Sequence, residues 1–146
     1  MAGDAFASST APREGAPDLL DPAVRARLSG GGFRVFLSIC DELGLSVPER
    51  RRLLGDVSEA TYHNWRSKGP PALSVDQLER ISLVLGIYKD LKLLFTDFAT
   101  SLRWLRAANA DLPFAGSSPQ ATMLRGSIDH LYKVRRYLDA WRGGRP

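Results

Sequence analysis

The chain has 146 residues, 44% of them apolar, and a formal net charge of +4, which fits one domain or two small ones. No apolar run approaches the roughly 18 residues that cross a bilayer, and the first residues do not resemble a secretory signal, so we expect a cytoplasmic protein without a membrane partner. The single cysteine, Cys40, excludes an internal disulfide and a cysteine-based zinc site, and its apolar neighbours predict a buried side chain rather than a reactive thiol.

The first third of the chain contains helix signals separated by helix breakers. Residues 1–20 are mainly Ala, Ser, Pro, Gly and Asp without apolar periodicity, which predicts a disordered N-terminal tail. Asp21 followed by proline predicts a short helix, and the glycines at 30–32 predict its interruption. Apolar residues at spacings of three and four then predict a stronger helix over residues 33–43, ended by Gly44.

The remaining elements are also predicted to be helices, because serine or aspartate caps precede apolar residues at helical spacing. Their expected ranges are 48–55, 58–68, a stretch after Ser74 that continues past Gly86 to Phe95, a stretch from Asp97 through Leu105, 119–126 and 128–142. No segment of useful length alternates with period two, so no sheet is expected. The predicted fold class is therefore all-α, a helical bundle.

Two of these helices, Pro48–Gly55 and Ser58–Lys68, have the dimensions of a helix-turn-helix. In such a unit the second helix lies in the major groove of DNA, and Tyr62 and Trp65 would anchor it to the domain. The predicted DNA-binding residues, which would read bases or contact phosphates, are Ser58, Ala60, Thr61, Asn64, Arg66 and Lys68. The same pattern also fits an ordinary solvated face, and Glu59 would repel phosphate, so both interpretations stay open.

A run of three arginines, Arg50, Arg51 and Arg52, lies on the first of these two helices. Their side chains could contact DNA phosphates, which provide affinity independent of sequence. A run of charges is, however, more often a solvated helix face.

The last 22 residues carry the whole net charge of the chain. Residues 125–146 contain six lysine or arginine residues and two aspartates, so residues 1–124 are neutral. Helical projection puts Arg135 and Arg142 on one edge of an apolar stripe, and Lys133 and Arg136 on the exposed side. The stripe itself consists of Ile128, Leu131, Val134, Leu138 and Trp141. A basic amphipathic helix of this kind is typical of a segment that one protein inserts into an acidic or phosphate-binding cleft of another.

The alternative for this helix is purely structural. Cations late in a helix complement its dipole, which explains Arg142 well and Lys133 poorly. The ring of Trp141 is expected to be covered, either by the rest of the chain or by a partner.

No catalytic constellation is visible in the sequence. The histidines His63 and His130 have no ligand set around them, the carboxylates are scattered singly, and no glycine-rich phosphate loop is present. We therefore expect a protein that is not an enzyme and that holds no cofactor or metal.

Several separated motifs follow one another along the chain. They are Leu54–Trp65, Leu78–Lys89, Trp104–Asn109, Phe114–Gly116, Pro119, Met123–Leu124, Gly126–Ser127 and Val134–Gly144. In this order they resemble the Xre/MbcA/ParS antitoxin family, and the resemblance covers residues 33–144. It is specific because several motifs agree, whereas a helix-turn-helix alone would be weak evidence.

The resemblance implies an Xre-like helix-turn-helix domain, over residues 21–96, and a helical toxin-binding domain, over residues 97–146. The usual partner in the family is a RES-domain toxin that destroys NAD⁺, and the antitoxin covers the entrance to its active site. Many members also repress their own operon. The predicted toxin-binding residues are Arg125, Lys133, Arg135, Arg136, Tyr137, Trp141, Arg142, Gly143 and Gly144. Glu59 departs from the polar or basic residue that the family often has there. This departure weakens the case for autorepression but not the case for toxin neutralisation.

Two other functions remain open at this point. A stand-alone helix-turn-helix transcriptional regulator would bind operator DNA without a partner, and a structural assembly subunit would form a stable homo-oligomer. Reading of two half-sites favours a homodimer within a toxin–antitoxin hetero-oligomer, although no particular dimer surface identifies itself.

Overall fold

The computed structural model describes residues 17–143. Residues 1–16, which form most of the predicted N-terminal tail, lie outside the described residues, and so does Gly144. The described part contains seven α-helices and no strand, which confirms the all-α prediction. They are α2 (Pro22–Leu43), α3 (Val47–Leu53), α4 (Glu59–Lys68), α5 (Val75–Leu94), α6 (Phe98–Arg106), α7 (Pro119–Met123) and α8 (Ile128–Arg142).

Helix starts follow the capping signals of the sequence. Every helix is preceded by a serine or aspartate whose side chain accepts a hydrogen bond from a backbone N–H of the first turn. The pairs Ser46–Glu49 and Ser74–Gln77 form complete capping boxes, in which each side chain bonds the backbone of the other residue. These bonds satisfy N–H groups that the helix itself leaves without acceptors.

The predicted interruption at the three glycines is wrong. Helix α2 continues from Pro22 to Leu43 through residues 30–32. Packing overrides the low helix propensity of glycine here, because Phe33 and Phe36 bury the second half of α2 in the core. The buried Ser29 hydroxyl, one residue before the glycines, accepts a 2.8 Å hydrogen bond from the backbone of the loop before α5.

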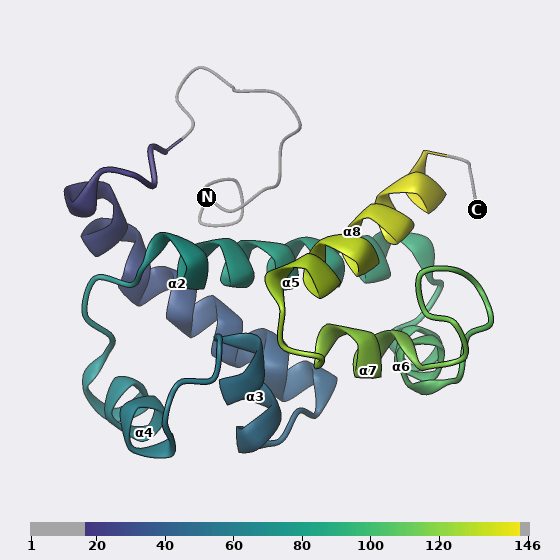
Figure 1. Cartoon of the computed structure of the whole chain (residues 1–146), viewed down its shortest axis with the longest axis horizontal. Coiled ribbons are helices and arrows are strands. Elements are labelled where there is room, and N and C mark those ends of the chain that lie inside the picture. The colour runs from purple at the N-terminus through teal and green to yellow at the C-terminus, as the bar shows by residue number, and fades with distance from the viewer. Residues whose placement is uncertain (1–16, 144–146) are drawn as a thin grey trace.

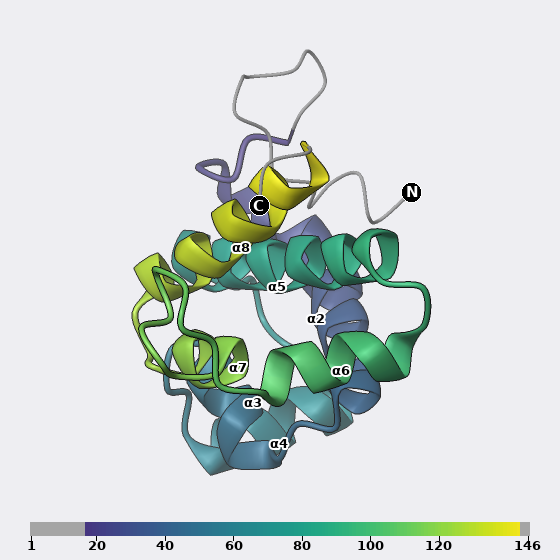
Figure 2. The ribbon, with the colours of Figure 1, turned by 90° about the vertical axis from the view of Figure 1, so that its right-hand side faces the viewer.

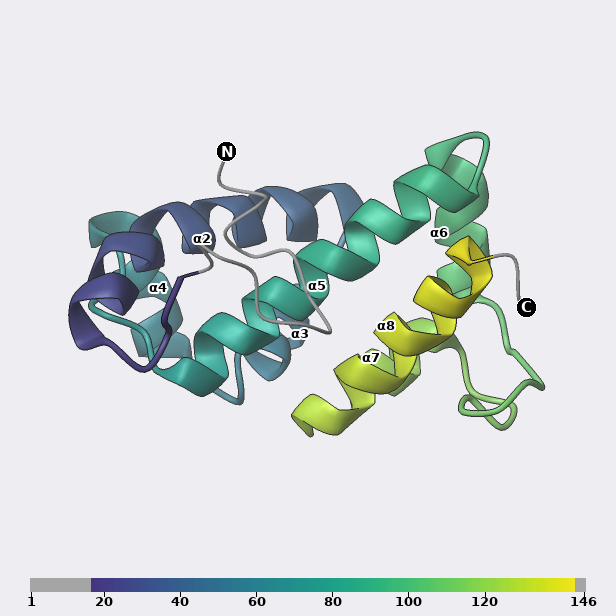
Figure 3. The ribbon, with the colours of Figure 1, turned by 90° about the horizontal axis from the view of Figure 1, so that it is seen from above.

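Helix α5 is the central element of the fold. It packs against α2 and also against α8, and it runs beside α8 in the same direction (Figure 3). α5 and α8 form one side of the molecule, and α3, α4, α6 and α7 lie on the opposite side (Figures 1 and 2). One buried hydrophobic cluster extends from Phe33 on α2 to Leu138 on α8. The predicted boundary at residue 96 therefore falls between two groups of helices that share a core.

Gly30→Ala is expected to stabilise the protein by about 0.5–1 kcal/mol, because alanine is the better helix former in a helix interior. A methyl group at this position would meet only the end of the Arg34 side chain, at 3.6 Å, so no clash opposes the gain. Urea unfolding measures the change. A loss of stability would show that α2 is not a continuous helix in solution.

Candidate functional site

The buried face of α8 is the apolar stripe that the sequence predicts. Leu131, Val134 and Leu138 are almost completely buried, whereas Ile128 and Trp141 at the two ends are partly buried. This face packs mainly against α5. The terminal helix is therefore an integral part of the fold, and only its other face and its C-terminal end are available to a partner.

Arg135 is the predicted toxin-binding cation that the protein itself buries. Its side chain is only 9% exposed, and its Nε donates to Asp139 at 3.0 Å and lies 3.5 Å from the Asp90 carboxylate. The guanidinium occupies the space above Gly86 of α5, where a Cβ atom would overlap it. Arg135 thus holds α8 onto α5.

Asp90 lies at the centre of this charge network and is completely buried. Arg142 donates to it from the last turn of α8 at 2.9 Å, while keeping 45% of its own side chain exposed. Burial and the neighbouring Asp139 carboxyl raise the pKa of Asp90 to about 7, whereas Arg142 and Arg135 lower it. The end of α8 is therefore fixed by a buried carboxyl that the sequence analysis did not identify.

Two predicted toxin-binding aromatics, Tyr137 and Trp141, belong to an internal aromatic cluster. The Tyr137 ring stacks on Trp104 with centroids 6.0 Å apart, and its hydroxyl donates to Asp111 at 2.7 Å. The Trp141 ring lies 6.0 Å from Phe95 and 5.8 Å from Tyr137. The Trp141 ring was expected to be covered either by the rest of the chain or by a partner. In the structure, side chains of the same chain cover part of it.

The remaining predicted toxin-binding residues lie on the surface. Lys133 and Arg136 project from the outer face of α8 and share the carboxylate of Asp129, at 3.4 and 3.8 Å. Arg125 is exposed in the turn before α8, and Gly143 is exposed directly after it. These residues and the half-exposed Arg142 surround the free face and the C-terminal end of α8.

The predicted DNA-reading helix has the two faces expected for it. Tyr62 and Trp65 are buried against Phe33, whose ring centroid lies 5.8 Å from that of Trp65. Ser58 is the cap of α4, and its hydroxyl also donates to Thr61 at 2.9 Å. The other predicted DNA contacts are exposed, namely Ala60, Asn64, Arg66 and Lys68. Within residues 17–143, the last three make no side-chain hydrogen bond or ion pair.

The three consecutive arginines of α3 all have internal partners. Arg50 is buried and donates to Asp41 at 2.8 Å and to the Leu45 carbonyl at 2.9 Å. Arg51 donates to the Val57 carbonyl, and Arg52 bonds the turn between α7 and α8. Each of the three arginines therefore has a structural role, so the charge run is more than a solvated face.

The structure also bears on the cysteine, on metal binding and on membrane insertion within the described residues. Burial raises the pKa of the Cys40 thiol to about 12, which makes it a poor nucleophile and fits the predicted buried side chain. Residues 17–143 contain no group of three side chains suited to hold a metal ion. No helix in this range is both long enough and apolar enough to cross a bilayer.

Comparison with known proteins divides the chain into two matched regions. Residues 22–86 match the antitoxin Xre-like helix-turn-helix domain, and residues 90–144 match the antitoxin Xre/MbcA/ParS C-terminal toxin-binding domain. The chain is also similar to the uncharacterized protein y4oB of Sinorhizobium fredii (strain NBRC 101917 / NGR234). The two are 40% identical over 112 residues, which is 77% of this chain and 84% of that protein.

Trp141→Ala is expected to destabilise the free protein by about 2–3 kcal/mol, because it removes a partly buried ring from the aromatic cluster. Thermal unfolding measures the loss. Tyr132→Ala is the matched control, since Tyr132 is a partly buried aromatic of the same helix that contacts the Arg136 guanidinium and lies outside the aromatic cluster. Equal melting temperatures for the two variants would contradict an internal role for Trp141.

Proposed function

Because this chain belongs to the Xre/MbcA/ParS antitoxin family, we propose that it neutralises a RES-domain toxin by covering the entrance to the toxin's NAD⁺ site. The match of residues 90–144 to a toxin-binding domain supports a protein partner for this part of the chain. The RES identity of the toxin and the occlusion mechanism are the steps that we add.

The observation that carries the proposal is the division of charge on α8. Arg135 is neutralised inside the protein, whereas Lys133 and Arg136 share one carboxylate on the outer face. Together with Arg125 and Arg142, they leave a net positive surface around the free face and the end of the helix. A positive surface of this kind binds and orients a partner that has acidic groups around its pocket.

The proposed contacts are therefore a subset of the predicted ones. We assign direct toxin contact to Arg125, Lys133, Arg136, Arg142 and Gly143. Tyr137, Trp141 and Arg135 would act from within, by fixing the position and direction of α8. A steric inhibitor depends on such rigidity, because ordering a mobile segment on binding would reduce the affinity.

Replacing Arg125 and Arg136 together by alanine is expected to weaken toxin binding by about tenfold or more, equivalent to about 1.4 kcal/mol, because both exposed charges would meet the partner. Titration calorimetry with the purified toxin measures affinity, and NAD⁺ consumption measures neutralisation. The paired variant Arg27→Ala with Arg34→Ala removes two exposed charges from α2 and is the control. If both pairs neutralise the toxin equally well, Arg125 and Arg136 are not part of the inhibitory surface.

Binding of operator DNA through α4 is the second proposed function. It is supported by the exposed and unpaired side chains of Asn64, Arg66 and Lys68 on a helix anchored like a recognition helix. This function would provide operon autorepression, with a homodimer reading two half-sites. If the chain binds DNA without the toxin, it also fits a stand-alone helix-turn-helix regulator.

Arg66→Ala and Lys68→Ala are each expected to reduce the salt dependence of operator binding by about one unit of log–log slope, because each removes a phosphate contact. Asn64→Ala should instead relax base preference, by about 1–3 kcal/mol at one position. Fluorescence anisotropy with DNA from upstream of the gene, at several salt concentrations, measures both effects. Lys133→Ala is the control on α8, and a slope that none of the α4 variants changes would exclude this surface.

A further inference from the structure

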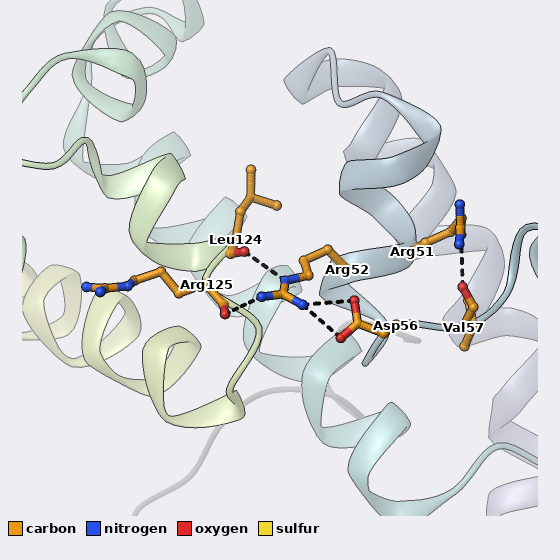
Figure 4. Close-up of polar contacts among 6 residues, drawn as sticks. All are labelled: Arg51, Arg52, Asp56, Val57, Leu124 and Arg125. Atoms are coloured by element: carbon orange, nitrogen blue, oxygen red, sulfur yellow. Dashed lines mark hydrogen bonds and ion pairs between the residues drawn. The ribbon is translucent and has the colours of Figure 1, made fainter.

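The turn that leads into α8 is held by a side chain from the helix-turn-helix. Arg52 of α3 extends to this turn, where its Nε donates to the Leu124 carbonyl at 3.1 Å and its Nη2 donates to the Arg125 carbonyl at 2.6 Å (Figure 4). Leu124 and Arg125 are each more than 70 positions from Arg52 in the sequence. One guanidinium thus connects the region matched as a helix-turn-helix with the region matched as a toxin-binding domain.

The guanidinium is fixed from both sides. Its Nη1 donates to both carboxylate oxygens of Asp56, at 3.1 and 2.9 Å, which leaves Nε and Nη2 directed at the turn. On the other side lies Gly126, with φ of +108°, where a Cβ atom would be 2.6 Å from the Arg52 Cζ. The turn can approach Arg52 this closely only because residue 126 has no side chain.

The backbone that Arg52 holds carries one of the proposed toxin contacts. The Arg125 carbonyl points toward Arg52, whereas the Arg125 side chain extends in the opposite direction (Figure 4). Ser127, two residues later, is the N-cap of α8. Fixing the peptide group of Arg125 therefore fixes where its side chain leaves the backbone and where α8 begins.

We propose that Arg52 is a positioning residue of the toxin-binding surface, which acts from the helix-turn-helix by orienting Arg125. This inference rests on the proposed binding of a toxin to α8. It assigns to an arginine of the DNA-binding half a role in toxin affinity, without contact between that arginine and the toxin.

Arg51 provides a closely matched control. It is the neighbouring residue on α3 and also donates to a backbone carbonyl, that of Val57, at 2.9 Å (Figure 4). Its hydrogen bond stays within the helix-turn-helix. Arg51→Ala and Arg52→Ala thus remove the same side chain from the same short helix, and only Arg52→Ala releases the turn before α8.

The test compares toxin affinity in the full-length wild type, Arg51→Ala and Arg52→Ala, with the melting temperature of each variant measured in parallel. We expect Arg52→Ala to weaken affinity for the RES-domain toxin by about tenfold, because charge-assisted hydrogen bonds to the turn are lost. Arg51→Ala should remain within about twofold of wild type. Arg52→Lys keeps the charge but cannot span the same acceptors, so we expect a smaller loss in a variant that retains its fold.

A double-mutant cycle with Arg125→Ala separates positioning from general destabilisation. If Arg52 acts through Arg125, the two losses are less than additive, because Arg52 has little left to orient once the Arg125 side chain is gone. Additive losses, or equal affinities of Arg51→Ala and Arg52→Ala, would overturn the inference while the wild type still binds the toxin. Failure of the wild type to bind would overturn the proposed function, and this inference with it.

Discussion

The arrangement of the C-terminal half depends on one buried contact between α5 and α8. Arg135 fills the space above Gly86 and, with Arg142, surrounds the completely buried Asp90. A buried charge is costly unless it is paired and hydrogen-bonded, so these groups stabilise the fold only in their mutual arrangement. Because the cation also fills the gap left by a missing Cβ, packing and charge pairing impose the same register on the two helices. That register determines which face of α8 solvent and partners can reach.

The net charge of the terminal segment does not show how many of its cations lack a carboxylate partner. Four of the five predicted basic contacts have a carboxylate partner in the same fold. Arg135 and Arg142 pair with Asp90, and the cations on the outer face share Asp129. Salt and solvent weaken such exposed pairs, so they can be exchanged for pairs with another protein at small cost. The contacts with Asp90 involve a completely buried carboxyl, and they keep the helix in position. One helix thus separates an inner set of charge contacts, which fixes its position, from an outer set that can be exchanged.

Sequence reasoning succeeded where local chemistry determines the outcome. Helix caps and the apolar stripe of α8 follow from hydrogen-bonding needs and periodicity, and both were predicted correctly. It failed at the glycines of α2, where burial of the following aromatics outweighs propensity. Asp90 and the partners of Arg52 could not be identified, because both depend on contacts between distant segments. The only signal for Asp90 was a lone acid within the apolar pattern of α5, after Gly86.

The positions of Gly86 and Arg135 have a consequence for recombination between relatives. Gly86 is the last residue matched to the helix-turn-helix domain, whereas Asp90 and Arg135 lie in the region matched to the toxin-binding domain. A recombination crossover between residues 86 and 90 would leave both matched domains intact. It would nevertheless separate the glycine from the guanidinium that needs its space. A chimaera made by such a crossover therefore keeps this contact only when the parent that supplies residue 86 has a glycine there, or when the exchanged piece begins before residue 86.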